Sequence, residues 1–349
     1  MKEKIIKGTF IQPEFIIDWS REEYDKHFER YLELGFDHII LQWSEYMEPK
    51  TGTWFTYYPT NIFNRITKND LLTKLLEAGS KYQIKVYLGL GTSKDWWSII
   101  KKSPMEFDKW FSKQADENII LLKDIWSTYS NNCYRQAIAG WYIAYEPDNI
   151  NFNSKEKRNV FIKHCERIVR TGHEYSKLPI VMSPFFNRAF EQNYGPQKWG
   201  GLMHDIAKGT GIDIIAVQDG IGCRRQAIDD KEQKRSKALK DVDKWFKASL
   251  KGIKKARNNT RLWADIETFT EKIEEGKSVF YSASIKRIVK QIKIEKPFVE
   301  KITSFSFQAY QDFDKDEELF ESYKKYVSDY KSRNEGIFWL DRIFHIFFK

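Results

Sequence analysis

Residues 138–147 read Ile-Ala-Gly-Trp-Tyr-Ile-Ala-Tyr-Glu-Pro, an apolar run of strand length that ends in a carboxyl side chain. Nearly every position in the run is apolar or β-branched, which is typical of a strand covered on both faces in a parallel sheet. Seven more runs of this kind follow one another along the chain, at residues 8–12, 38–43, 85–90, 179–183, 213–218, 261–266 and 302–307.

Helical stretches with recognisable start signals separate these runs. Ser20–Glu23 and Asn153–Glu156 have the spacing of capping boxes, and Ser103 combines a cap with a first-turn proline and Glu106. The apolar stripe within residues 278–295 predicts one further helix.

Eight strands that alternate with helices predict an α/β fold, a single (β/α)8 barrel over residues 1–335. The spacing between strands leaves no room for a second globular domain. A doubly wound sheet is the alternative, but it would need a glycine-rich turn after its first strand. This chain has Gln12-Pro13-Glu14-Phe15 there, so the barrel is favoured.

Composition excludes several classes of protein. The chain has 349 residues, of which 41% are hydrophobic, so it has ample material for a large core. No apolar run is long enough to span a membrane, and three cysteines do not form a disulfide framework. The polar start at residues 1–7 leads us to expect a cytoplasmic protein, or a secreted one if a leader was removed.

The net charge of +9 is concentrated in one segment, residues 224–257, which has 13 basic and 5 acidic residues. Apolar residues three and four apart, from Leu239 to Ile253, predict an amphipathic helix with a basic outer face. A nucleic-acid patch is one interpretation. Acidic residues interrupt the lysines and no aromatic residues alternate with them, so we expect a solvated face and no nucleic-acid partner.

The ends of the predicted strands carry amides, hydroxyls and carboxyls, and in a barrel such ends form the active site. Histidine and lysine are absent from them, which disfavours a histidine-held metal and Schiff-base chemistry. The sequence has no nucleophile elbow and no phosphate loop, so we expect neither a cofactor nor a metal. The polar ends are Gln12, Glu14, Gln42, Glu45, Ser93, Asp95, Glu146, Ser183, Asn187, Gln218, Asp219, Glu267, Gln308 and Tyr310.

Glu146 and Glu267 stand out because each ends a strand rich in aromatic residues. Glycoside hydrolysis needs such a pair, one carboxyl protonated and the other ionised. The aromatic neighbours of Glu146 suit the acid, and the serines and amides expected near Glu267 suit the anion. Period-two alternation predicts that Trp263, Asp265 and Glu267 face the barrel interior. The same rule, applied to the last strand, predicts Ser304, Ser306 and Gln308 inward and Phe305 and Phe307 outward.

Aromatic residues also crowd the loops at residues 54–58 and 96–97, where flat rings suit the apolar faces of sugars. Packing onto the barrel helices is the alternative explanation for these rings. The residues that we expect to contact a carbohydrate substrate are Gln12, Trp43, Glu45, Trp96, Asn187, Gln218, Asp219, Gln308 and Tyr310.

Several blocks resemble the bacterial domain-of-unknown-function 4434 family of TIM-barrel proteins. They are Gly8-Thr-Phe-Ile-Gln12, Gly140-Trp-Tyr-Ile with Glu146, Ser183-Pro-Phe-Phe186, Val217-Gln-Asp-Gly-Ile-Gly222 and Trp263-Ala-Asp-Ile-Glu-Thr-Phe269. The resemblance implies a barrel and a carbohydrate substrate, as expected for a glycoside hydrolase.

The strand positions of the two glutamates are also similar to those in clan A retaining glycosidases. The resemblance implies an acid/base role for Glu146 and a nucleophile role for Glu267. The chain departs from that pattern at Tyr145, where those enzymes have Asn, and at Gln308, where they often have Trp. Two alternatives stay open: Asp219 replaces one of the pair, or the barrel binds polysaccharide without cleaving it and assists its synthesis or export.

The C-terminal tail, residues 336–349, is strongly apolar but too short to span a bilayer. A membrane-surface helix and a dimer contact are alternatives. Residues 337–340 are apolar without a break, which favours a segment packed against its own barrel. Deleting the tail is therefore expected to lower the melting temperature and leave vesicle binding unchanged. Loss of liposome co-sedimentation on this deletion would show that the tail binds membranes instead.

Overall fold

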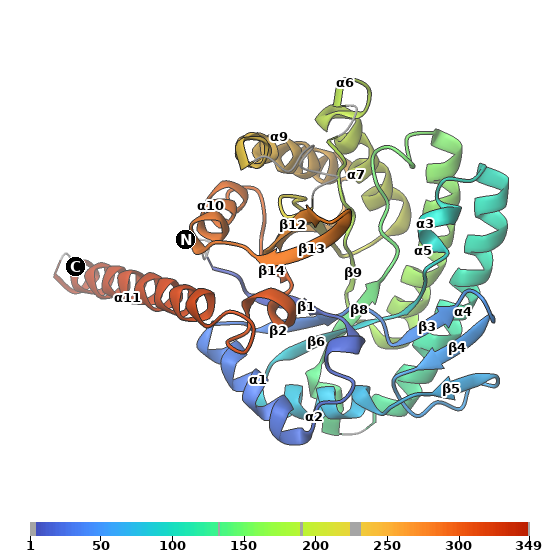
Figure 1. Ribbon diagram of the computed structural model, residues 1–349, viewed down its shortest axis with the longest axis horizontal. Helices are drawn as coiled ribbons and strands as arrows, with labels where there is room; N and C mark the ends of the chain where they lie inside the picture. Colours follow the sequence, from blue (N-terminus) through green and yellow to red (C-terminus); the bar gives the residue numbers. More distant parts are fainter. Residues whose placement is uncertain (1–4, 132, 189–190, 224–231, 348–349) are drawn as a thin grey trace.

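The computed structural model describes residues 5–131, 133–188, 191–223 and 232–347, with no side-chain description for 232–237 and 334–347. Its centre is a closed barrel of eight parallel strands (Figure 1). Each strand pairs with the next barrel strand along the chain, and β1 closes the barrel against β14. The strands are β1 Gly8–Ile11, β2 His38–Leu41, β6 Lys85–Gly89, β8 Ile138–Ile143, β9 Ile180–Met182, β10 Ile214–Gln218, β11 Arg261–Glu267 and β14 Ile302–Phe305. All eight predicted strands are confirmed.

Helices surround the barrel on the outside, and the last of them begins beside the barrel and runs outward from it (Figure 1). They are α1 Arg21–Glu33, α2 Leu71–Tyr82, α4 Pro104–Tyr129, α5 Lys155–Ser176, α7 Pro196–Thr210, α9 Glu232–Ala256, α10 Ile285–Glu295 and α11 Glu317–Phe347. The predicted capping boxes of α1 and α4 are both present. The cap of α5 is Ser154 rather than Asn153, because the Ser154 hydroxyl accepts the Lys157 amide at 3.2 Å.

Two insertions at the C-terminal ends of the strands differ from the expected loops and helices (Figure 1). The segment after β2 forms a small sheet with β7, in the order β5–β4–β3–β7. The predicted helix at 278–295 begins only at Ile285, because residues 277–282 pair with β12 as a hairpin. The strands involved are β3 Glu45–Glu48, β4 Thr53–Thr56, β5 Arg65–Thr67, β7 Gly91–Ser93, β12 Phe269–Glu274 and β13 Lys277–Ser282.

The barrel interior is filled by a layer of large side chains that includes Phe10, Tyr142 and Trp263. Trp263 lies in this layer, and Asp265 and Glu267 line the cavity above it, so the predicted alternation of β11 is confirmed.

The predicted alternation of the last strand, β14, is wrong by one residue. Phe305 packs on the interior layer and lines the cavity, while Ile302 faces the outer core. In the parallel register, Phe305 pairs with the inward-facing Glu267, and neighbouring strands share their faces at paired positions. Ser304 pairs with Ile266, which faces the outer core, and therefore does not face inward as predicted. Phe307, just after the strand, lies in the outer core as predicted.

The amphipathic face of the basic segment is confirmed where side chains are described. Leu239, Val242, Phe246 and Ile253 of α9 are buried. Residues 224–231 and the side chains of 232–237 lie outside the described part, as do those of the tail from residue 334 onward. Packing of the tail on the barrel therefore stays a prediction. Within the described ranges, no helix is both long and apolar enough to cross a membrane.

Candidate active site

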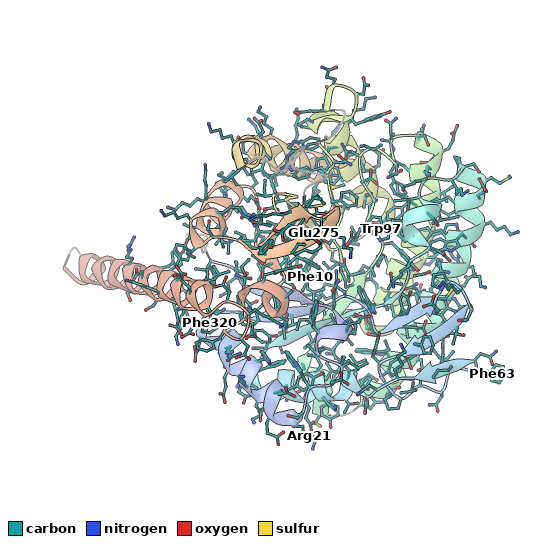
Figure 2. All side chains as sticks on the ribbon, viewed as in Figure 1. Phe10, Arg21, Phe63, Trp97, Glu275 and Phe320 are labelled. Carbon is teal, nitrogen blue, oxygen red and sulfur yellow. The ribbon has the colours of Figure 1, made fainter. Side chains whose placement is uncertain are left out.

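A cavity of about 1190 Å³ opens at the C-terminal ends of the barrel strands. Its floor comes from the strand ends, and its walls come from the small sheet, the loop around α3 Trp96–Ile99 and the hairpin β12–β13. Phe10 lies near the middle of the barrel and Trp97 toward the side of α3 (Figure 2). This is the face on which barrel enzymes carry their active sites.

Glu146 follows β8 on the cavity wall and is partly exposed to it. Pro147 comes directly after it and has no N–H to continue the strand pairing, so the side chain stands at the strand's tip. Partial burial raises the pKa of Glu146 to about 7, and a hydrogen bond from the Gln218 side chain opposes this rise. Near neutral pH, both the protonated and the ionised form of the Glu146 carboxyl are therefore populated.

Glu267 ends β11 and is only 4% exposed, yet it lines the same cavity. Its Oε2 atom accepts a hydrogen bond from the backbone N–H of Cys223 at 2.7 Å. Burial, and then the carboxyl of Asp219, raise the pKa of Glu267 to about 8, while the amides of Cys223 and Gly222 oppose this rise. These amides stabilise the anion when Glu267 ionises.

Asp219 is fully buried behind the cavity and does not line it, so its placement does not match the predicted contact with substrate. Its Oδ1 atom accepts the backbone amides of Ile221 at 3.0 Å and Glu267 at 3.2 Å. Its Oδ2 atom accepts the Gln291 side-chain amide at 2.5 Å. These bonds join the end of β11 to the loop that carries Cys223. Asp219 thus holds the backbone around the site in position. Because its carboxyl does not reach the cavity, it is poorly placed to replace Glu146 or Glu267 in catalysis.

Of the other eight predicted contact residues, five line the cavity and three do not. The five are Gln12, Trp43, Trp96, Asn187 and Gln218. Glu45 is fully buried and bonded to Arg65 at 2.5 Å, because the strand that follows Ser44 turns into the small sheet. Gln308 is buried in the turn after β14, and Tyr310 packs on Phe269 with ring centroids 5.1 Å apart.

Some of the aromatic loop residues line the cavity, as expected for contact with a sugar, and others pack into the protein core, which was the alternative explanation. Trp96 is only 3% exposed and belongs mostly to a cluster of rings in the outer core, whereas Trp97 is 49% exposed at the cavity. Trp54 and Tyr58 are buried outside the cavity lining, and only Tyr57 of that loop reaches it.

The predicted contact set omitted several residues of the cavity lining. They include Tyr46, Tyr57, Lys94, Trp97, Phe185, Cys223, Asp265, Phe269 and Phe305. The correct inward and outward alternation of the last strand would have identified Phe305. Phe269 could have been found in the same way, because it follows the inward-facing Glu267 by two positions. Cys223 and Phe185 lie on irregular loops, for which period-two and period-3.6 patterns provide no signal.

No group of three or more His, Cys, Asp or Glu side chains is arranged to hold a metal within the ranges that the structure describes. The chemistry available at the cavity is that of carboxyls, amides, hydroxyls and aromatic rings, together with the thiol of Cys223 and the ammonium groups of Lys68, Lys94 and Lys101.

The model of a domain of unknown function, DUF4434, matches residues 6–316. The chain belongs to this family. The resemblance seen in the sequence is thereby confirmed. Among curated proteins, an uncharacterized Escherichia coli K12 protein, YbcH, is 23% identical over 199 residues. That match covers 57% of this chain and 59% of YbcH, less than two thirds of the relative's length.

Solved structures of similar fold are named as glycoside hydrolases. A Bacteroides thetaiotaomicron protein named a "putative alpha-L-fucosidase" is 19% identical, with a TM-score of 0.70 and 94% of both chains covered. A β-galactosidase from Marinomonas ef1 has a TM-score of 0.60 at 11% identity, covering 95% of this chain and 60% of the other. An endo-1,4-β-mannanase from Rhizomucor miehei has a TM-score of 0.56 at 11% identity, covering 93% and 95%. At these identities the likeness shows the fold, a TIM barrel of the kind found in carbohydrate-active enzymes.

Substituting Asp219 tests its place in the framework. Asp219→Ala leaves the buried backbone amides of Ile221 and Glu267 without their acceptor and removes one of the two acceptors of the Gln291 amide. We therefore expect it to lower the free energy of unfolding by about 2–4 kcal/mol. Asp219→Asn keeps one acceptor oxygen and is expected to cost less than half as much. Urea denaturation measures both variants, and equal losses would contradict the bridging role.

Proposed function

We propose that this protein is a glycoside hydrolase that acts on a polysaccharide or oligosaccharide, with Glu146 and Glu267 as its catalytic carboxyls. The observation that carries the proposal is that both side chains, from β8 and β11, line one aromatic-rich cavity at the C-terminal end of the barrel. Glycoside hydrolysis needs two such carboxyls on either side of the bond that breaks.

In the proposed reaction Glu146 is the general acid that protonates the leaving oxygen. Its raised pKa keeps a proton available near neutral pH. Glu267 acts as the nucleophile in its ionised form, in which the Cys223 amide stabilises the anion. Water would then release the sugar from Glu267, with Glu146 as the base, and retain the anomeric configuration.

The cavity's size and lining support a carbohydrate ligand. Its volume of about 1190 Å³ exceeds the roughly 300–1,000 Å³ of ordinary small-molecule pockets, which suits several linked sugar rings. Trp97 offers an exposed indole face at the wall, next to Phe185 at 6.1 Å between ring centroids. Apolar rings together with scattered amides and carboxyls match the mixed surface of a sugar.

A barrel that binds polysaccharide without cleaving it remains the second candidate, because the aromatic lining serves binding equally well. Two carboxyls with raised pKa values at one cavity favour hydrolysis. A binding site gains little from carboxyls whose pKa is raised by burial, since their desolvation costs free energy.

Incubating the purified protein with a panel of polysaccharides and measuring release of reducing ends separates the two candidates. We expect release from at least one substrate, and NMR of the first product should show the retained anomer. Binding without release across the panel would favour the non-catalytic barrel, and an inverted product would overturn the nucleophile role of Glu267.

Glu146→Gln and Glu267→Gln are each expected to fold normally and to lose about 10²-fold or more in kcat, because each removes a group that takes part in bond cleavage. Glu48→Gln is the matched control, since Glu48 lines the same cavity from the small sheet. It should change kcat less than about tenfold. Full activity in either of the first two variants would exclude that residue from catalysis.

The pH dependence of kcat/KM should be bell-shaped. Activity requires Glu267 ionised, which is lost as pH falls below its pKa of about 8, and Glu146 protonated, which is lost as pH rises above its pKa of about 7. The maximum is therefore expected between pH 7 and 8, with a fall of about tenfold per pH unit well outside it. A plateau that extends from pH 4 to 7 would contradict this protonation scheme.

The pH profile does not tell which glutamate is the acid and which is the nucleophile. If the two roles were exchanged, the pair would still hold one proton in its active form, and the pH profile would be the same. Azide rescue of alanine variants assigns the roles. We expect Glu267→Ala to form a glycosyl azide of inverted configuration and Glu146→Ala to form one of retained configuration.

A further inference from the structure

A third carboxyl, that of Asp265, lies at the floor of the cavity. Asp265 is two residues before Glu267 on the inward face of β11 and is 2% exposed. Its Oδ2 atom lies 3.4 Å from the Ser183 hydroxyl, a long contact, and that hydroxyl donates to the Ala216 carbonyl at 2.8 Å. Its Oδ1 atom is buried and has no hydrogen-bond partner in the part of the chain that the structure describes.

The charged groups that surround Asp265 are acidic. The carboxyls of Asp219, Glu267 and Glu146 all add to burial in raising its pKa well above the usual range. The nearby guanidinium groups are engaged with backbone oxygens: Arg188 donates to Asp219 and Gly220, and Arg287 to Glu267 and Phe269. No described lysine or arginine of the barrel strands lines the cavity, and the cavity lysines come from the outer walls.

Burying the Asp265 carboxyl among other carboxyls costs free energy when no ligand is bound. A buried carboxyl that lacks a partner loses its hydration, and three carboxyls around one cavity repel one another when ionised. A neutral hydroxyl would satisfy one hydrogen bond and leave the excess of acidic groups unchanged. An ammonium group supplies three N–H donors and a positive charge, so it offsets both costs.

We propose that the sugar ring bound between Glu146 and Glu267 carries an amino group, and that Asp265 binds this group and selects for it. The inference rests on the proposed function for the placement of the ring between the two glutamates. When the free amine enters, it takes the proton of the Asp265 carboxyl, and an ammonium–carboxylate pair forms. The substrate class is therefore an amino sugar, and N-acetylation of the amine would remove its advantage.

Calorimetric titration with three pairs of monosaccharides tests the selection: glucosamine and glucose, galactosamine and galactose, and mannosamine and mannose. For at least one pair we expect the amino sugar to bind the wild-type protein about tenfold or more tightly than the hexose. The corresponding N-acetylated sugar should lose this preference. The comparison among ligands needs no variant, so it stands even if a substitution disturbs folding.

Asp265→Asn should reduce the preference to less than about threefold, because the amide cannot accept a proton or carry a negative charge. Glu48→Gln is the matched control, since it likewise replaces a carboxyl of the cavity lining with an amide but lies outside the group of carboxyls around Asp265, and it should keep the preference. Circular dichroism checks that both variants fold.

Equal binding of amino sugar and hexose in all three pairs would overturn the inference. So would a preference that survives in Asp265→Asn. If neutral polysaccharides are hydrolysed with dependence on Glu146 and Glu267 while amino sugars gain nothing, the proposed function stands and the substrate class is wrong. If amino sugars bind through Asp265 and no polysaccharide is cleaved, selection is supported and the hydrolase is not.

Discussion

One carboxylate, that of Asp219, accepts hydrogen bonds from the backbone amides of Ile221 and Glu267 and from the Gln291 side chain. Through these bonds the end of β11, the loop after β10 and the helix α10 hold a common position. The same loop carries the Cys223 amide that reaches the Glu267 carboxyl, and the Gly222 carbonyl, which accepts the Glu271 backbone amide at 3.0 Å, also holds it. The same negative charge adds to burial in raising the pKa of Glu267, so one buried group affects both the position and the protonation of its neighbour.

Such a site costs stability. The pKa of Glu146, like that of Glu267, is raised above its value in an unfolded chain, so the folded protein binds protons more tightly. The sign of this linkage is that folding stability falls as pH rises from about 4.5 toward 7 and 8. The large outer core, with its clustered rings around Phe111 and Phe161, provides the burial that offsets this cost.

The fold was predictable because its signal is local and repeated. Each barrel strand is an apolar run between a helix end and a polar tip, and one misread run would not have changed the result. The direction of Glu267 also followed from alternation along β11. The alternation of β14 could not be predicted in this way, because serines and phenylalanines alternate there and either set could face the barrel interior. Only the pairing with β11 shows which set does so. Asp219 was misplaced for a related reason: a carboxyl at a strand end can face the cavity or turn behind it, and its partner Gln291 lies 72 residues away.

The small sheet after β2 has a consequence for how a ligand would be received. β3 pairs with β7, so two successive loops of the barrel are joined by backbone hydrogen bonds instead of moving separately. Tyr46 and Ser93, which line the cavity, lie on these paired strands. A wall built this way is preorganised, because its conformational entropy was lost on folding and is not lost again on association. On this side the cavity receives its ligand on a rigid surface, whereas on the opposite side the β12–β13 hairpin forms a sheet of its own that is not paired with a neighbouring loop.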